Sequence, residues 1–192
     1  MENITSIQTE RLILREFTES DAKAIFSILS DPEVNTFLPM FPLKTLDEAK
    51  AYLNNHYLNQ TGFHYAICLK NDNIPIGYIN VSDDESHDLG YGLCKEFWHR
   101  SIVAEACQSA VNQLKHSGLS YLTATHDIKN PRSGEVMKKI GMTYRYSYEE
   151  LWQPKNIRVI FRMYQLNLDG QDDRTFMKYW NQSSIRFVEK IK

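Results

Sequence analysis

Hydrophobic positions follow a helical repeat most clearly in the middle of the chain. The segment AEACQSAVNQLKHSG (104–118) continues an apolar stripe made by Val103, Ala106, Cys107, Ala110, Val111 and Leu114. Spacings of three and four residues place these side chains on one face of a helix. Gly118 suits the end of that helix, because glycine readily adopts the left-handed backbone conformation found there. The pattern therefore predicts a well-formed amphipathic helix that packs on a core.

Segments rich in β-branched and aromatic residues, bounded by polar turns, predict strands in most of the remaining chain. These segments are 9–17, 62–70, 74–81, 88–95, 119–127, 142–152 and 156–168. Capping-box sequences at 18–21 (TESD) and 45–48 (TLDE) predict two helices after the first strand, and Asn130-Pro131 predicts a short later one. The strand at 119–127 should run parallel to the strand at 88–95, since a helix separates them.

The predicted order is thus β, α, α, β, β, β, α, β, α, β, β. It indicates an α/β protein of the α+β kind, with a mixed, mostly antiparallel central sheet and one β-α-β crossover near its middle. We assign residues 1–168 to the domain and 169–192 to a C-terminal appendage, for which a helix is one option. Ligands bind such sheets where neighbouring strands diverge at their carboxyl ends. The apolar loop 35–43 (NTFLPMFPL) must pack against the domain or line a pocket.

Composition and charge narrow the functional classes. Among 192 residues, 42% are hydrophobic and 24% charged, as in globular proteins, and the net charge of -2 gives no electrostatic case for nucleic acid as a partner. The three cysteines lack metal-site spacing and are expected to be buried thiols. No signal peptide and no membrane-spanning run is expected, so we predict a cytoplasmic protein with no metal, as a monomer or a homodimer.

Four segments carry a resemblance to a known family: TERLILREF (9–17), LGYGLCKEFW (89–98), the helix containing Glu105-Ala106, and above all HDIKNPRSGEVMKKIGM (126–142). Together with the order of elements they resemble the GNAT superfamily of acetyl-CoA-dependent N-acetyltransferases. The match is closest to its Rim-type branch, which acetylates N-terminal amines of ribosomal proteins and various small or peptide amines. The resemblance extends over about residues 7–168 and does not account for the tail.

The resemblance implies that the turn at 98–103 binds the pyrophosphate of CoA through its backbone amides. In the family this turn carries glycines, whereas here His99, Ser101 and Val103 stand at the characteristic positions. With a negative φ, Ser101 would offer its amide and hydroxyl to a phosphate, and Arg100 would add a charged contact. We expect weakened but retained CoA binding. The implied cofactor-binding set is Leu93, Cys94, Arg100, Ser101, Ile102, Val103, Ala104, Asn130 and Ser133.

The resemblance also implies direct acetyl transfer to an amine, with backbone groups of Leu93 and Cys94 at the pantetheine arm and the reacting oxygen. Asn130 would hydrogen-bond that arm or cap its helix. Ser133 would lie near the CoA sulfur and donate a hydrogen bond there, or only complete the capping of its helix. Met137 stands where many relatives have a tyrosine acid. His126 is the candidate base, or else a structural histidine.

Asp88 is a second carboxylate candidate for the base, or a solvated turn residue. Phe37, Leu38 and Phe41 would line the pocket for a small-molecule or peptide amine, or belong to the core. One alternative is a GNAT-fold protein without catalysis, which senses CoA or binds another protein. Another alternative is an enzyme that uses a different acyl-CoA.

Overall fold

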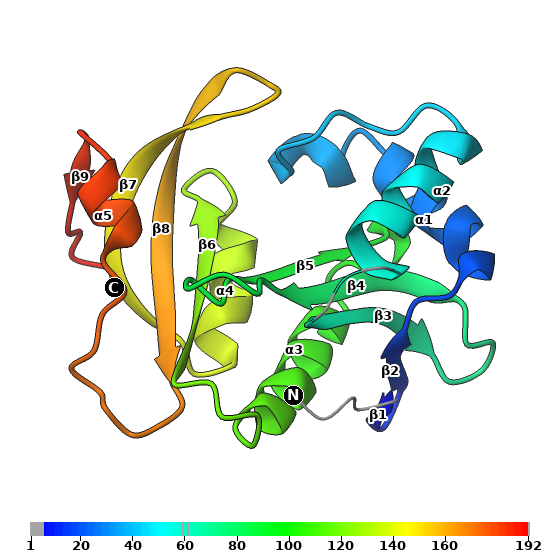
Figure 1. Ribbon diagram of the computed structural model, residues 1–192, viewed down its shortest axis with the longest axis horizontal. Coiled ribbons are helices and arrows are strands. Elements are labelled where there is room, and N and C mark those ends of the chain that lie inside the picture. The colour runs from blue at the N-terminus through cyan, green and yellow to red at the C-terminus, as the bar shows by residue number, and fades with distance from the viewer. Residues whose placement is uncertain (1–5, 59, 61, 192) are drawn as a thin grey trace.

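Two antiparallel sheets form the framework of the molecule, as a computed structural model shows (Figure 1). The structure describes residues 6–58, 60 and 62–191. Residues 1–5, which begin the segment predicted to lack a signal peptide, lie outside the described residues. The first sheet has the order β1-β2-β3-β4-β5. Its strands are β1 (Ser6–Gln8), β2 (Leu12–Glu16), β3 (Phe63–Leu69), β4 (Pro75–Val81) and β5 (Leu89–Leu93).

The second sheet has the order β6-β8-β7-β9. Its strands are β6 (Tyr121–Asp127), β7 (Thr143–Trp152), β8 (Ile157–Asn167) and β9 (Arg186–Phe187). The sheets touch through one parallel bridge between Asp88 and Thr123, and the backbone N–H of Thr123 donates to the carbonyl of His87 over 3.3 Å. The predicted parallel pairing of β5 and β6 is therefore limited to this point. Beyond it the two strands separate, because β6 pairs along its length with β8.

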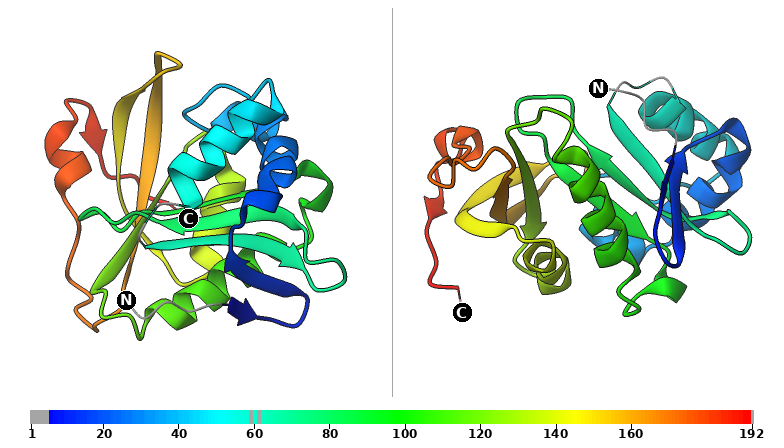
Figure 2. Two further views of the ribbon diagram at one scale, coloured as in Figure 1. Left: turned by 45° about the vertical axis from the view of Figure 1, so that its right-hand side comes forward. Right: turned by 90° about the horizontal axis from the view of Figure 1, so that it is seen from below.

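Helices cover both faces of the first sheet, since its strands are apolar on both faces (Figures 1 and 2). On one face α1 (Ala22–Ser30) and α2 (Leu46–Leu53) pack against Ala66, Cys68 and Tyr78. On the other, α3 (Ile102–Leu114) and α4 (Pro131–Lys139) pack against alternate strand residues such as Ile67 and Ile79. The predicted β-α-β crossover is β5-α3-β6, and the fold class is confirmed.

Several boundaries differ from the sequence prediction for local reasons. The predicted first strand is interrupted at Thr9, whose backbone N–H donates to the carbonyl of Leu12 over 3.0 Å, so that β1 and β2 form a hairpin. The TESD segment first makes a 3₁₀ turn over Glu19–Asp21, and α1 begins only at Ala22. A further 3₁₀ turn, Val34–Phe37, precedes the apolar loop.

The C-terminal segment packs on the second sheet. It contains α5 (Lys178–Gln182) and then β9, which pairs with β7. The Tyr146 hydroxyl donates to the carbonyl of Phe176 over 2.7 Å, and Arg162 forms an ion pair of 2.5 Å with Glu189. Phe176, Tyr179 and Trp180 belong to an aromatic cluster with β7 and β8. Aromatic side chains therefore hold the otherwise polar tail on the second sheet.

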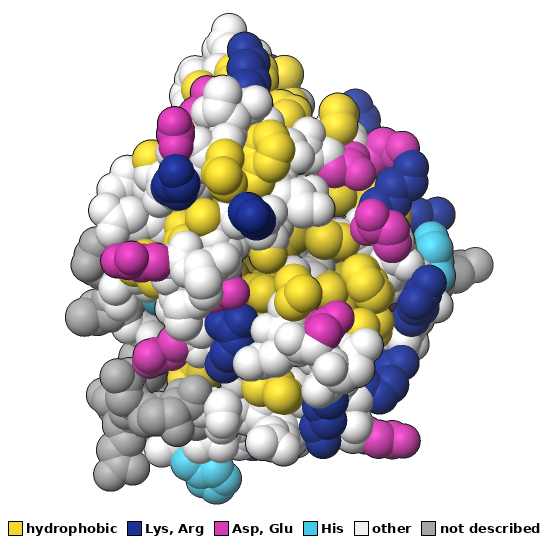
Figure 3. Space-filling view, turned by 90° about the vertical axis from the view of Figure 1, so that its right-hand side faces the viewer, with side chains coloured by type: hydrophobic (Ala, Val, Ile, Leu, Met, Phe, Trp, Pro, Cys, Tyr) yellow, Lys and Arg dark blue, Asp and Glu magenta, His cyan; other side chains and the backbone are white. Residues whose placement is uncertain are grey.

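Charges of both signs are mixed on the outer face beside β1 and β2 (Figure 3). No group of Lys and Arg dominates that view, which agrees with the balanced composition. No helix among the described residues is long and apolar enough to span a membrane.

Candidate functional site

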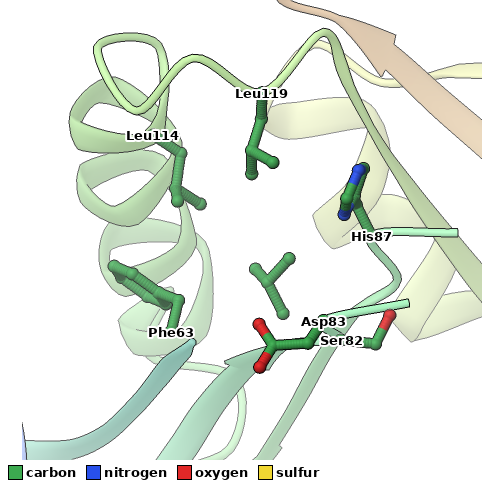
Figure 4. Close-up of a pocket in the computed structure, with 7 residues that line it drawn as sticks. Phe63, Ser82, Asp83, His87, Leu114 and Leu119 are labelled. Carbon is green, nitrogen blue, oxygen red and sulfur yellow. The ribbon is translucent and has the colours of Figure 1, made fainter. Parts of the chain in front are cut away.

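A large cavity opens where β5 and β6 separate. Its volume is about 1260 Å³, and its walls come from the 3₁₀ turn before α2, the starts of α3 and α4, and the face of β7. Pockets for small ligands usually measure roughly 300–1,000 Å³, so this cavity has room for more than one bound group. A second cavity near the β4–β5 turn, lined by Phe63, Asp83 and Leu119 among others, measures only about 50 Å³ (Figure 4).

Most residues of the predicted site meet in the large cavity. Those that line it are Phe37, Leu38, Leu93, Arg100, Ser101, Ile102, Val103, Ala104, His126, Asn130 and Ser133. Cys94 and Phe41 are not among the lining residues, and the Phe41 side chain is 57% exposed. Residues separated by nearly 100 positions thus converge on one place.

The turn before α3 keeps a glycine-like backbone without glycine. His99 has φ of 62° and Ser101 has φ of 58°. The negative φ that would let Ser101 cap the helix is therefore absent, and its side chain makes no capping hydrogen bond. Left-handed φ values are costly for residues with a Cβ, and they persist when the surrounding structure enforces them. The residues at the start of α3, from Ser101 to Ala104, line the cavity.

An ion-pair network holds this turn in place. The Glu105 carboxylate accepts from the Thr9 hydroxyl over 2.5 Å and from the Arg11 Nε over 2.7 Å, and the Arg11 guanidinium also donates to the Arg100 carbonyl over 3.1 Å. The side chains of Arg11 and Glu105 are only 44% and 22% exposed. The β1–β2 turn therefore fixes the backbone next to Ser101, which accounts for the presence of Glu105 in the resemblance.

We expect Glu105→Ala to lower the free energy of unfolding by about 1–2 kcal/mol, because it removes several partly shielded hydrogen bonds to a charged group. Urea denaturation measures this change. Asp47→Ala is the matched control, since its ion pair with Lys50 is open to solvent and such pairs contribute little. Equal stabilities of the two variants would show that the network does not anchor the turn.

Basic side chains surround the part of the cavity next to α3 and α4. Arg100 shares it with Lys129, Arg132 and Lys139, three lining residues that the sequence reasoning did not single out. The sequence could have pointed to them, because Lys129 precedes the N-P-R-S segment, Arg132 lies within it and Lys139 ends α4. Clustered cations beside the N-terminus of a helix suit phosphate groups, so this part fits a phosphate-rich ligand such as CoA.

The edge of β5 that faces the cavity has backbone groups directed away from β4. The N–H of Cys94 donates to the Ile76 carbonyl over 2.8 Å, so it is not available to a reacting oxygen, contrary to the sequence prediction. Bonded and non-bonded pairs alternate in an antiparallel ladder, so the backbone of Leu93 and Tyr91 points toward β6. The Leu93 carbonyl indeed accepts from the Trp98 indole over 2.9 Å. Burial raises the pKa of the Cys94 thiol to about 11, which disfavours a nucleophilic thiolate.

Ser133 and Tyr91 form a hydroxyl pair across the cavity. The Tyr91 hydroxyl donates to the Ser133 carbonyl over 2.8 Å and lies 2.9 Å from the Ser133 Oγ. A tyrosine from β5 thus reaches the first turn of α4, although Met137 occupies the helix position where a tyrosine acid was sought. Asn130 stands at the N-cap position of α4 and makes no side-chain capping bond, which leaves its amide beside the cavity.

His126 is packed against helix α4. Its Nδ1 lies 2.8 Å from the Asp127 carbonyl, and its side chain is 4% exposed. A Cβ at Gly134 would come within 2.6 Å of the His126 Nε2, so α4 directly covers that nitrogen. Burial lowers the pKa of His126, opposed by its hydrogen bond to the Asp127 backbone. This geometry is that of a neutral, packed imidazole.

Asp88 has the stronger features of a base. It sits at the point where the two sheets part, and it lines the cavity. Burial raises the pKa of Asp88 to about 7; a hydrogen bond from Thr123, 3.2 Å long, opposes the rise, and the Asp84 and Glu150 carboxylates add to it. A carboxylate with this pKa accepts protons efficiently near neutral pH.

The tip of the β7–β8 hairpin reaches the segment before α2 (Figure 1). The Lys155 Nζ donates to the Asn35 carbonyl over 2.6 Å. Phe37 and Leu38, two and three positions after Asn35, line the cavity.

Comparisons with known proteins agree with this arrangement. Residues 11–143 match the Acetyltransferase (GNAT) domain family. The chain is 28% identical over 140 residues to YnaD of Bacillus subtilis (strain 168), described as an uncharacterized N-acetyltransferase; the match covers 71% of this chain and 81% of that one. The crystal structure of a GNAT-family acetyltransferase from Bacillus anthracis superposes with a TM-score of 0.76 at 23% identity, covering 85% and 99% of the two chains.

A structure of RimL, a ribosomal L7/L12 alpha-N-protein acetyltransferase in complex with coenzyme A, superposes with a TM-score of 0.71 at 18% identity. That match covers 85% of this chain and 98% of the other. Because the family match spans more than half of the sequence, the chain belongs to the GNAT acetyltransferase family. It is an acyltransferase enzyme.

Proposed function

We propose that the protein transfers an acetyl group from acetyl-CoA directly to a primary amine, either a small molecule or the N-terminus of a peptide or protein. The observation that carries this proposal is the left-handed backbone at His99 and Ser101, at the start of α3, which opens onto the cavity between β5 and β6. The basic residues beside it suit the phosphates of CoA. The acceptor would enter from the side of Asp88 and the β7–β8 hairpin.

The reaction forms a C–N bond and breaks the thioester C–S bond. An acceptor that arrives as an ammonium ion loses two protons, of which the leaving thiolate takes one and solvent receives the other. We assign the removal of the first proton to Asp88, in place of His126, because α4 covers the His126 Nε2. The N–H groups of Tyr91 and Leu93, which both point away from β4, are the candidate donors to the acetyl oxygen.

A CoA-release assay on a panel of amines and N-terminal peptides, with calorimetry of CoA binding, tests the proposal. We expect CoA binding and release of thiol with at least one amine class. A protein that binds no CoA would contradict the proposed function. Binding without turnover on any amine would favour a CoA-sensing module.

Ser133→Ala should lower kcat by about tenfold or more, because its hydroxyl lies with Tyr91 where the leaving sulfur would be, and hydrogen bonds to charged groups have large effects. Steady-state kinetics measures the loss, and CoA affinity should change much less than kcat. Thr36→Ala is a suitable control, since the Thr36 hydroxyl bonds only to the Pro32 carbonyl outside the cavity. Undiminished turnover would remove Ser133 from the reaction.

A further inference from the structure

The C-terminal segment supplies one wall of the cavity. Tyr179 of α5 lines it and stacks on Tyr148 of β7, with ring centroids 5.1 Å apart and an interplanar angle of 14°. The Tyr179 side chain lies near Ser86, Thr123 and the Asp88 carboxylate. The GNAT family match ends at residue 143, so this wall lies outside the matched region.

Two carboxylates face this wall. Asp88 and Glu150 both line the cavity, and burial raises the pKa of each carboxyl. The Glu150 carboxylate adds to the rise at Asp88. No ion pair among the described residues joins either of them to Lys or Arg. The neighbouring Glu149, by contrast, lies 2.6 Å from the Arg158 guanidinium. Partly desolvated carboxylates without a basic partner favour a bound cation.

Aromatic rings complete the surroundings of these carboxylates. Trp152 and Phe161 line the same region with ring centroids 5.1 Å apart, and Phe161 lies 5.7 Å from Tyr148. Tyr148 lies near Glu150 and opposes the rise of the Glu150 pKa. Electron-rich ring faces attract ammonium groups, most strongly where water is excluded.

From these carboxylates without an ion-pair partner and the aromatic rings around them, we infer that the acceptor carries a second positive charge: Asp88 receives the reacting ammonium, and Glu150, with Tyr148 and Tyr179, holds the other cation. This inference rests on the proposed function and names the class of amine. It also gives the C-terminal segment a role, in which Tyr179 is a specificity-determining residue.

Matched acceptors test the inference. Calorimetry on the CoA-loaded protein compares 1,4-diaminobutane with n-butylamine, and a peptide with lysine at its second position with one carrying norleucine there. We expect the dicationic member of at least one pair to bind about tenfold more tightly, as expected for a charge-assisted contact. The pair that shows the preference distinguishes a small diamine from a basic N-terminus. Equal binding within both pairs overturns the inference.

Variants assign the preference to residues. Glu150→Gln should abolish it, whereas Glu149→Gln, one position along β7 and paired with Arg158, should preserve it. Tyr179→Ala should reduce it, and Tyr179→Phe should keep the ring stack and much of the preference. Thermal unfolding confirms that each variant is folded, and a preference that survives Glu150→Gln overturns the inference. Because CoA binding is measured separately, a failure of this inference is distinct from a failure of the proposed function.

Discussion

Asp88→Asn should lower kcat/KM by about 100-fold or more at pH 8, within the range that general-base catalysis contributes. In the unaltered protein the rate should rise with pH and level off above about 7, where burial has placed the pKa of Asp88. The ionised carboxylate accepts the amine proton, so activity follows its deprotonation. The variant should lack this inflection, and a pH profile of kcat/KM measures both effects.

The same substitution should not weaken the fold at high pH. Because the pKa of Asp88 is raised in the folded state, that state holds the proton more tightly than the unfolded chain does. The free energy of unfolding should therefore fall between about pH 4 and pH 7, by at most about 4 kcal/mol for a rise from 3.8 to about 7. Asp88→Asn should remove this decline and be at least as stable at pH 8.

These two measurements separate chemistry from folding. A variant that is stable but slow supports Asp88 as the base. Asp47→Asn, an exposed helix position outside the cavity, should alter neither the rate nor its pH dependence. Wild-type rates with an unchanged pH inflection in Asp88→Asn would assign the base elsewhere.

Ser101→Val should weaken CoA binding by about tenfold or more, because a β-branched residue is a severe outlier at the φ of 58° found there. Ser101→Gly should bind CoA as tightly as the unaltered protein or more tightly, since glycine adopts this conformation without strain. Calorimetry with CoA measures both affinities. Opposite effects of the two substitutions at one position would show that backbone conformation determines binding.

Ser109→Val makes the same exchange within α3, at a helical position outside the cavity, and should leave CoA affinity unchanged. If Ser101→Val binds CoA normally, the left-handed turn is not the phosphate site. If Ser101→Gly loses affinity, the serine hydroxyl itself contributes the contact, as the sequence interpretation had considered.

Local patterns were sufficient to predict the elements and the approximate place of the site. The stripe from Val103 to Leu114 predicted α3, the β-rich segments 62–70 and 74–81 predicted β3 and β4, and the segment 126–142 carried the family resemblance. These patterns can be recognised in the sequence because periodicity and turn chemistry depend on only a few neighbouring residues.

Properties that depend on distant segments were decided only in the tertiary structure. The sequence left open whether a turn without glycine could keep its shape; the contact of Arg11 and Glu105 with its backbone fixes Ser101 in the left-handed region. The sequence left Asp88 as either a candidate base or a solvated turn residue. Burial at the junction of the two sheets raises its pKa to about 7.

The tail shows the same division. The sequence predicted that residues 169–192 form an appendage. It could not show that Tyr179 stacks on Tyr148, which lies 31 positions earlier in the chain, or that both rings line the cavity. The sequence by itself determined most of the helices and strands, β1 and β9 excepted, and which turn precedes α3. Tertiary packing decided backbone strain, burial and charge environment, because these depend on which distant side chains exclude water from each group.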